Sequence, residues 1–240
     1  MYIQSSDPTI EKIYQSIIGN QDMLVSSVIY GQRYSGKTSL IRKLYKGATW
    51  VDGANLKEVH KALEDSQKVV ITNFEKVTNI DSLNFENVHV LALYNSKHFN
   101  KKLENKFAFI YHFPPLSQRE EDIKNFSKYY IEHIKELLDA PANLEIDETL
   151  FDLSENLKSL KKSIYKEIML KTLTKDELYR ALYYNFVNSP LEENIYDTEL
   201  KLFDKAIIDA GLKRFKSQLQ VSKKFGISRN TLRKKIDELD

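Results

Sequence analysis

Short apolar runs alternate with amphipathic stretches along the chain as far as Phe113. The runs predict β-strands at 24–30, 49–51, 69–73, 88–94 and 108–113. The stretches between them have helical spacing and predict helices at 8–18, 38–45 and 55–64. Strands that alternate with helices are typical of βαβ units around a parallel sheet. The pattern therefore predicts an α/β subdomain over residues 1–116.

After this subdomain every apolar pattern has helical spacing. Ser117 and Glu120 have the spacing of a capping box, which predicts the start of a helix. Thr174 and Glu177 repeat this spacing and predict another helix start. Shorter helices are expected at 147–153 and 156–169. We therefore expect residues 117–188 to form a helical lid subdomain.

Residues 189–240 have the pattern of a small all-α domain. A polar linker at 189–194 precedes helices expected at 195–210, 217–225 and 228–239. Gly226 separates the last two helices, and Ser228 is placed to cap the final one. A helix, a tight glycine turn and a second helix are typical of a helix-turn-helix, whose second helix lies in the major groove of DNA.

Composition excludes several classes of protein. The chain has 240 residues, of which 42% are hydrophobic and 29% charged, which is typical of globular domains. It has no cysteine, so thiolate metal sites, thiol catalysis and disulfide scaffolds are excluded. No apolar run reaches the roughly 18 residues of a membrane span, and the first residues lack the pattern of a signal peptide. We expect a cytoplasmic protein without membrane contact.

The net charge of +2 hides an uneven distribution. Residues 212–240 carry a net charge of +6, and the rest of the chain carries −4. A small basic end on a mildly acidic body indicates that only the end contacts a polyanion.

Residues 31–38, G-Q-R-Y-S-G-K-T, fit the phosphate-loop pattern G-x-x-x-x-G-K-[ST] completely. The pattern follows an expected strand and precedes an expected helix, so backbone N–H groups and the helix dipole can surround phosphate oxygens. Lys37 is expected to reach the β- and γ-phosphates, and the Thr38 hydroxyl to bind Mg²⁺. The predicted ligand is ATP or ADP, bound by Gly31, Gln32, Arg33, Tyr34, Ser35, Gly36, Lys37, Thr38 and Ser39.

The residues expected to support hydrolysis form a weaker pattern. The third strand ends in Thr72 and Asn73, where a carboxylate would normally hold Mg²⁺. Glu75 follows, and it is either a catalytic base or a solvated loop residue. Asn95, at the end of the fourth strand, either senses a γ-phosphate or is an ordinary polar strand end. We expect ATPase activity to be weak or absent.

The last expected helix presents a basic face. Arg229 lies near its N-terminus and suits a bidentate contact with guanine. The alternative is a solvated Lys/Arg face, which the lack of any acid between 212 and 235 disfavours. The predicted contacts with double-stranded DNA are Lys216, Ser217, Gln218, Ser228, Arg229, Asn230, Thr231, Arg233, Lys234 and Lys235.

A single helix-turn-helix binds DNA weakly, because it contacts few phosphates. Specific binding therefore predicts a homodimer or higher homo-oligomer that reads two half-sites. The helix expected at 195–210 is apolar enough to pair with its own copy. Packing within the small domain is the competing use of the same residues.

Several segments resemble the bacterial enhancer-binding proteins, the AAA+ activators of sigma-54 RNA polymerase. They include the Ser5-Ser6-Asp7-Pro8 start and the phosphate loop. Residues 113–123, F-P-P-L-S-Q-R-E-E-D-I, resemble the family's L-P-P-L-R-E-R-x-E-D-I, and residues 226–235, G-I-S-R-N-T-L-R-K-K, resemble the Fis signature. Residues 156–160 are a weaker likeness to the lid stretch G-N-V-R-E-L, which implies that Lys158 contacts the nucleotide in place of a sensor arginine. The resemblance implies an AAA+ P-loop module with a lid and a Fis-like domain.

The chain departs from this family at the parts that drive remodelling. No glycine occurs between Gly53 and Gly211, so the GAFTGA loop that contacts sigma-54 is missing. No arginine occurs between Arg42 and Arg119, which removes the arginine fingers, and no receiver domain is expected. Lys158 cannot form the planar contact of the sensor arginine. These departures imply a degenerate module that does not remodel sigma-54 polymerase.

The leading hypothesis is a DNA-binding transcriptional regulator with a degenerate, nucleotide-binding AAA+ module. One alternative is an active AAA+ ATPase that acts on DNA in replication or remodelling, with Glu75 and an arginine supplied in trans. Another is a protein-interaction scaffold that binds no nucleotide. Whether a protein binds this chain in addition to DNA is left open.

Overall fold

A computed structural model describes residues 5–188 and 193–239 of the chain. Its contacts divide the chain into two compact units, one that ends at Leu173 and one that begins at Thr174. The helix that follows Thr174 lies in the second unit, and the division into 1–116, 117–188 and 189–240 stays a prediction. Residues 189–192 of the expected linker lie outside the described residues.

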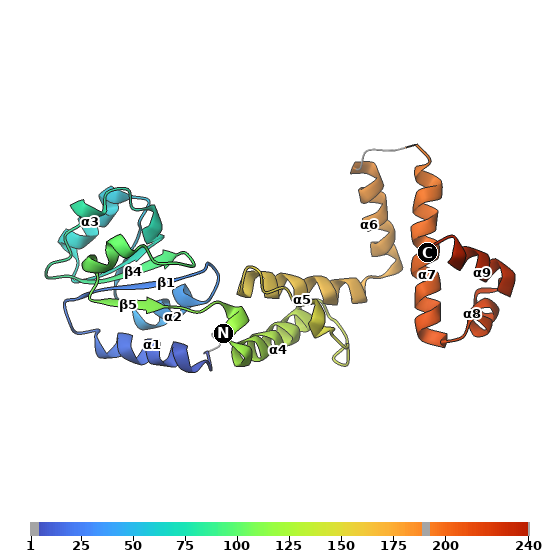
Figure 1. Cartoon of the computed structure of the whole chain (residues 1–240), viewed down its shortest axis with the longest axis horizontal. Helices are drawn as coiled ribbons and strands as arrows, with labels where there is room; N and C mark the ends of the chain where they lie inside the picture. Colours follow the sequence, from blue (N-terminus) through green and yellow to red (C-terminus); the bar gives the residue numbers. More distant parts are fainter. Residues whose placement is uncertain (1–4, 189–192, 240) are drawn as a thin grey trace. The chain divides into compact units, whose positions relative to one another are not determined.

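The first unit contains a parallel sheet of five strands (Figure 1). The strands are β1 (Ser26–Gly31), β2 (Thr49–Asp52), β3 (Lys68–Thr72), β4 (His89–Asn95) and β5 (Phe109–His112), in the spatial order β2-β3-β4-β1-β5. All the observed strand pairs are parallel. The strands agree closely with the apolar runs that predicted them, because parallel strands covered on both faces are apolar on both sides. The predicted α/β fold is confirmed.

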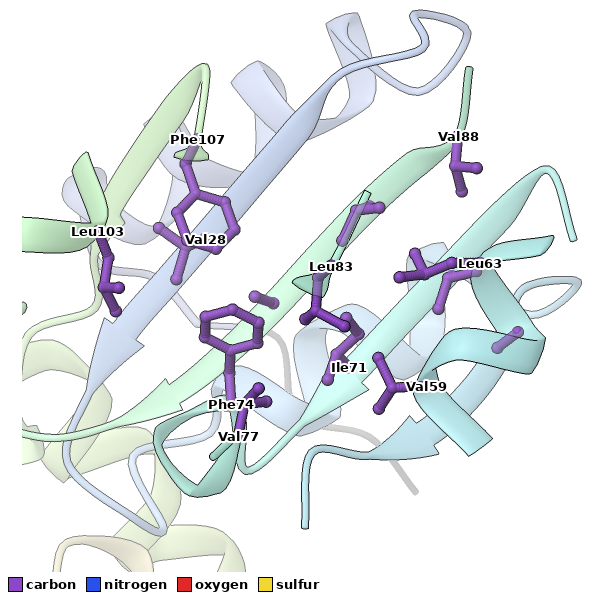
Figure 2. Close-up of a cluster of buried hydrophobic side chains, with 14 residues drawn as sticks. Val28, Val59, Leu63, Ile71, Phe74, Val77, Leu83, Val88, Leu103 and Phe107 are labelled. Atoms are coloured by element: carbon purple, nitrogen blue, oxygen red, sulfur yellow. The ribbon is translucent and has the colours of Figure 1, made fainter. Parts of the chain in front are cut away.

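Side chains alternate between the two faces of the sheet, and each face packs against helices. The helices are α1 (Pro8–Gly19), α2 (Lys37–Leu44) and α3 (Leu56–Asp65). On one face, Val28 of β1 lies in a buried cluster with Val59 of α3, as Figure 2 shows. On the other face, Ile29 of β1 lies in a cluster with Ile13 of α1 and Ile41 of α2. The sheet is therefore the middle layer of three.

The lid of the first unit is helical, as predicted. It consists of α4 (Glu120–Leu137) and α5 (Leu157–Thr172). Leu160, Ile164 and Ile168 of α5 form a buried core with Ile134 of α4. Short 3₁₀ turns in this unit are η1 (Phe74–Lys76), η2 (Ile80–Ser82), η3 (Lys101–Lys106), η4 (Leu116–Gln118) and η5 (Glu148–Leu150).

Two predictions for the lid are wrong. The segment 147–153 forms only the turn η5, because its aspartates bond with nearby backbone N–H groups and favour turns over a helix. The capping box at Ser117 and Glu120 does not form. Ser117 lies inside η4, and Arg119 is the N-cap residue of α4 without a side-chain cap bond. The Arg119 side chain extends into the protein interior instead.

Arg119 and Asp122 form an ion pair that is almost completely removed from solvent. Arg119 Nη1 donates to Asp122 Oδ2 at 2.7 Å, and both side chains are only 1% exposed. Asp122 also accepts from Ser5 Oγ at 2.5 Å and from the backbone N–H of Ser6 at 2.7 Å. Arg119 Nη2 donates to the backbone oxygen of Ser35 at 2.6 Å. This pair therefore joins the N-terminal segment, α4 and the loop that contains Ser35.

The second unit is entirely helical in its described residues. Its helices are α6 (Lys175–Asn188), α7 (Ile195–Phe215), α8 (Gln218–Phe225) and α9 (Arg229–Asp237). The capping box that predicted α6 is confirmed, because Thr174 N donates to Glu177 Oε2 at 2.8 Å and Glu177 N donates to Thr174 Oγ1 at 3.2 Å. α7 runs past residue 210 and ends where Lys216 adopts a left-handed backbone conformation.

A small core holds α7, α8 and α9 together. Its buried residues are Ile208, Val221 and Leu232. Gly211 allows α7 and α8 to approach closely, since a Cβ at that position would lie 2.5 Å from Cζ of Phe225. Within the described residues, no helix is both long and apolar enough to cross a membrane.

Candidate functional site

The phosphate-loop residues connect β1 to α2 at the carboxyl end of the sheet. β1 and β4 are neighbours there, and the connections that leave them run in opposite directions along the sheet. Ligands of open α/β sheets bind at this kind of position. Gly36 has φ 107°, which L side chains rarely adopt, and a Cβ at Gly31 would collide with the backbone oxygen of Phe113. The backbone path of the loop therefore requires both glycines.

Lys37 is almost fully buried, which is rare for a lysine. Its Nζ donates to the backbone oxygens of Gly31 at 3.0 Å and Gln32 at 2.9 Å. Burial lowers the pKa of Lys37 to about 8, against the opposing charge of Glu75. The ammonium group is thus held inside the loop and loses its proton more easily than an exposed lysine.

A cavity of about 480 Å³ lies between the phosphate loop, the strand ends and the lid. The predicted site residues that line it are Arg33, Tyr34, Gly36, Lys37, Thr38, Ser39, Asn95 and Lys158. Gly31, Gln32, Ser35 and Glu75 do not line it. The cavity is also lined by four residues that were not predicted to belong to the site: Asn73, Tyr130, Leu157 and Lys161. Lys161 could have been found, because it lies three residues after Lys158 and so on the same helix face.

Glu75, which follows β3, contacts Asn95, the last residue of β4. Glu75 Oε2 accepts from the backbone N–H of Asn95 at 2.9 Å, and Oε1 accepts from Asn95 Nδ2 at 3.1 Å. Arg33 Nη2 forms an ion pair with Glu75 Oε1 at 3.3 Å. Burial acts to raise the pKa of Glu75, but these hydrogen bonds outweigh it and lower the pKa overall. Glu75 is therefore a weaker base than a free glutamate.

The lid is bonded directly to the phosphate loop. Asn156 Nδ2 donates to Gln32 Oε1 at 3.1 Å and to the backbone oxygen of Arg33 at 2.9 Å. The backbone N–H of Leu157 donates to the backbone oxygen of Tyr34 at 3.2 Å. Gln32 therefore contacts the lid rather than the cavity.

Two lysines of α5 line the cavity, and they differ in their surroundings. Lys158 Nζ lies 3.0 Å from Glu155 Oε2 and 4.8 Å from the centre of the Tyr34 ring. Its hydrogen bond with Glu155 raises the pKa of Lys158. Lys161 is exposed and has no hydrogen-bond or ion-pair partner among the described residues.

A smaller cavity of about 160 Å³ lies beside the first turn of α2. Most of its lining is apolar or aromatic: Ile10, Leu40, Phe113, Phe126, Tyr129, Tyr130 and Leu157. Ser35 and Arg119 also line it, and Ser35 Oγ and Arg119 Nε are buried without a hydrogen-bond partner among the described residues. An apolar slot with a few polar atoms, next to a phosphate loop, suits an aromatic base.

α8 and α9 form the predicted helix-turn-helix. Gly226 has φ 68° between the two helices. Ser228 is the N-cap of α9, as predicted, because its Oγ accepts from the backbone N–H of Thr231 at 3.0 Å. Leu232 packs into the core and orients the opposite face of α9 toward solvent.

Most of the predicted DNA contacts are exposed on this domain. The exposed ones are Lys216, Gln218, Ser228, Arg229, Asn230, Thr231, Arg233 and Lys234, and Ser217 is half-buried. Lys234 Nζ lies 3.6 Å from Glu238 Oε1 on the surface, and an exposed ion pair of this kind contributes little to stability. Lys235 is half-buried and pairs with Asp204 of α7, so it is the least available of the predicted phosphate contacts.

Residues 199–239 match the family model described as bacterial regulatory protein, Fis family. The C-terminal domain is a Fis-type helix-turn-helix. The match covers most of α7 and all of α8 and α9, and it confirms the resemblance that residues 226–235 carried. A comparison of the whole chain with curated protein sequences found no match.

Solved structures of NtrX from Brucella abortus have a similar fold. The complex of NtrX with ADP matches with a TM-score of 0.53 and 14% identity, over 99% of this chain and 70% of that chain. The complex with ATP matches with a TM-score of 0.53 and 14% identity, over 100% of this chain and 70% of that chain. At this level of identity the likeness concerns the fold alone. It confirms the predicted combination of an AAA+-like P-loop fold and a helical Fis-type domain.

Proposed function

We propose that the chain is a transcriptional regulator that binds double-stranded DNA through its Fis-type domain. The observation that carries the proposal is the exposed cationic face of α9. Arg229 and Arg233 have no carboxylate partner on this face among the described residues. Lys223 and Lys224 of α8 are exposed as well. Cations without partners suit DNA phosphates and guanine edges.

The regulator binds DNA as a homodimer, with α6 and α7 at the interface. α6 has no buried residue, and its Tyr179 is 67% exposed. On α7, Tyr196 is 74% exposed. A groove of about 330 Å³ in this unit is lined by Phe186, Ile195, Tyr196, Glu199, Leu200 and Phe203. Apolar surface of this kind is typical of an interface, and a second copy supplies the second recognition helix.

The phosphate-loop module binds ATP or ADP. The buried Lys37 and the apolar slot beside α2 support this, as do the NtrX complexes with ADP and ATP. Hydrolysis is weak or absent, because the Glu75 carboxylate that would activate water is already hydrogen-bonded to Asn95 and paired with Arg33. Remodelling of sigma-54 polymerase is not expected, because the GAFTGA loop is missing from the sequence.

Arg229→Ala is expected to weaken binding to a preferred site by about 1–3 kcal/mol and to relax the sequence preference. Lys234→Ala should weaken binding to all sequences alike and reduce the slope of affinity against salt by about one. Fluorescence anisotropy with a site selected from a random DNA pool, and with unrelated DNA, measures both effects at several salt concentrations. Lys46→Ala, an exposed change in the first unit, is the control. Unchanged DNA binding after removal of residues 212–240 would contradict the proposal.

Nucleotide affinity is expected to fall as the pH rises above about 8. Lys37 must be charged to bind phosphate, and its pKa before binding is about 8. The bound phosphates raise the pKa of Lys37. The nucleotide affinity is therefore highest and constant below pH 8, and it decreases by about tenfold per pH unit above it. Titration of a fluorescent ADP analogue between about pH 7 and 9.5 avoids the phosphate ionisation near pH 6. Lys158→Gln should keep this pH profile, and a flat profile for the unmodified chain would contradict the assignment to Lys37.

A further inference from the structure

Among the residues that the structure describes, the nucleotide cavity is lined by cations and by no carboxylate. The cations are Arg33, Lys37, Lys158 and Lys161. Arg33 and Lys158 already have carboxylate partners, which lie at 3.3 Å and 3.0 Å and belong to residues outside the lining. Lys37 and Lys161 have no ion-pair partner among the described residues. One of these two ammonium groups belongs to the phosphate loop and the other to the lid.

The residues of this cavity do not fit a Mg²⁺ ion. In phosphate-loop sites the ion is held by the loop hydroxyl, here Thr38, and by a carboxylate at a strand end. The strand ends in this cavity present the amides of Asn73 and Asn95 instead. The carboxylate of Glu75 does not line the cavity, and it is occupied by Asn95 and Arg33. Across the described part of the chain, no group of three or more His, Asp or Glu residues is placed to hold a metal.

We propose that this site binds the nucleotide polyphosphate without a divalent cation, and that Lys161 supplies from the lid the positive charge that Mg²⁺ would otherwise supply. The inference rests on the proposed nucleotide function. Lys161 is better suited to this role than Lys158, because Glu155 and the Tyr34 ring already engage the Lys158 ammonium. The lysine stem is long and flexible, so Lys161 can follow the phosphates when the nucleotide enters.

Titration of the full chain with a fluorescent ADP analogue, in excess Mg²⁺ and in EDTA, tests this proposal. We expect a lower dissociation constant in EDTA than in excess Mg²⁺, because the site takes the metal-free nucleotide and Mg²⁺ competes with the site for it. Lys161→Gln should weaken binding about tenfold in both buffers, as for the loss of a hydrogen bond to a charged group. Lys162→Gln is the matched control, because Lys162 is also exposed on α5 but does not line this cavity. It should bind like the unmodified chain.

Electron paramagnetic resonance with Mn²⁺ in place of Mg²⁺ gives a second readout. If the site takes the nucleotide without its metal, adding the protein to a Mn²⁺–ADP solution releases the ion and increases the signal of free aqueous Mn²⁺. A decrease of that signal, binding that requires Mg²⁺, or equal affinities of Lys161→Gln and Lys162→Gln would each overturn the inference and leave nucleotide binding intact. Absence of binding in both buffers would overturn the proposed nucleotide function and this inference with it.

Discussion

Replacing Asp122 by alanine is expected to lower the free energy of unfolding of the first unit by about 3–5 kcal/mol. The change leaves the Arg119 guanidinium buried, 1% exposed, without its counter-charge. It also removes the acceptor of Ser5 Oγ and of the backbone N–H of Ser6. Trp50, the single tryptophan, belongs to this unit, so its fluorescence in a urea titration reports on this unit directly.

Glu121→Ala is the matched control for this change. Glu121 precedes Asp122 in α4 and pairs with Lys124 at 3.3 Å, but both of these side chains are well exposed. Its removal should cost less than about 1 kcal/mol, as for other surface ion pairs. If Asp122→Ala is as mild as Glu121→Ala, the buried pair does not hold the N-terminal segment and α4 together.

The double change Tyr196→Glu and Leu200→Glu is expected to separate the proposed homodimer and to weaken specific DNA binding by about a hundredfold or more. Both residues line the apolar groove of the second unit. Two carboxylates there would have to be desolvated without partners when the copies associate, which is strongly unfavourable. A monomer presents one recognition helix, so it retains the weak non-specific binding and loses the second half-site. Sedimentation equilibrium measures the oligomeric state, and anisotropy measures the affinity for DNA.

Leu137→Glu is the control, because it also replaces an exposed apolar side chain by a carboxylate. Leu137 is 64% exposed at the end of α4, in the first unit, and its change should alter neither the oligomeric state nor DNA binding. Far-ultraviolet circular dichroism of the double variant measures whether the helix content of the chain is retained. A folded double variant that remains dimeric and keeps its DNA affinity would show that another surface pairs the two copies.

The local elements could be predicted well because their signals lie within a few residues. Each apolar strand run can be recognised within one short segment, and the bonds of the capping box at Thr174 and of the cap at Ser228 are made by neighbours in sequence. The capping box at Ser117 has an equally good spacing and fails. Arg119, two residues further on, extends its side chain to the distant backbone of Ser35 and to Asp122, and the chain turns as η4 before α4 begins. A long-range contact overrides a local preference here.

The candidate site likewise combines features that depend on local sequence with features that depend on tertiary packing. The glycine–lysine loop and the basic stretch 212–235, which contains no acid, were sufficient to predict a phosphate site and a DNA-binding helix, because both chemistries depend on residue type and short spacing. The state of each charge depends instead on which chain segments pack together. Lys161 joins the cavity because α5 lies against the loop, Arg33 is neutralised because Glu75 lies beside it, and Lys235 is paired because α9 packs on α7. The two ion pairs join residues that are 42 and 31 positions apart, and Lys161 is more than 100 positions from the loop. Only folding brings these groups within the few ångströms at which charges and hydrogen bonds act.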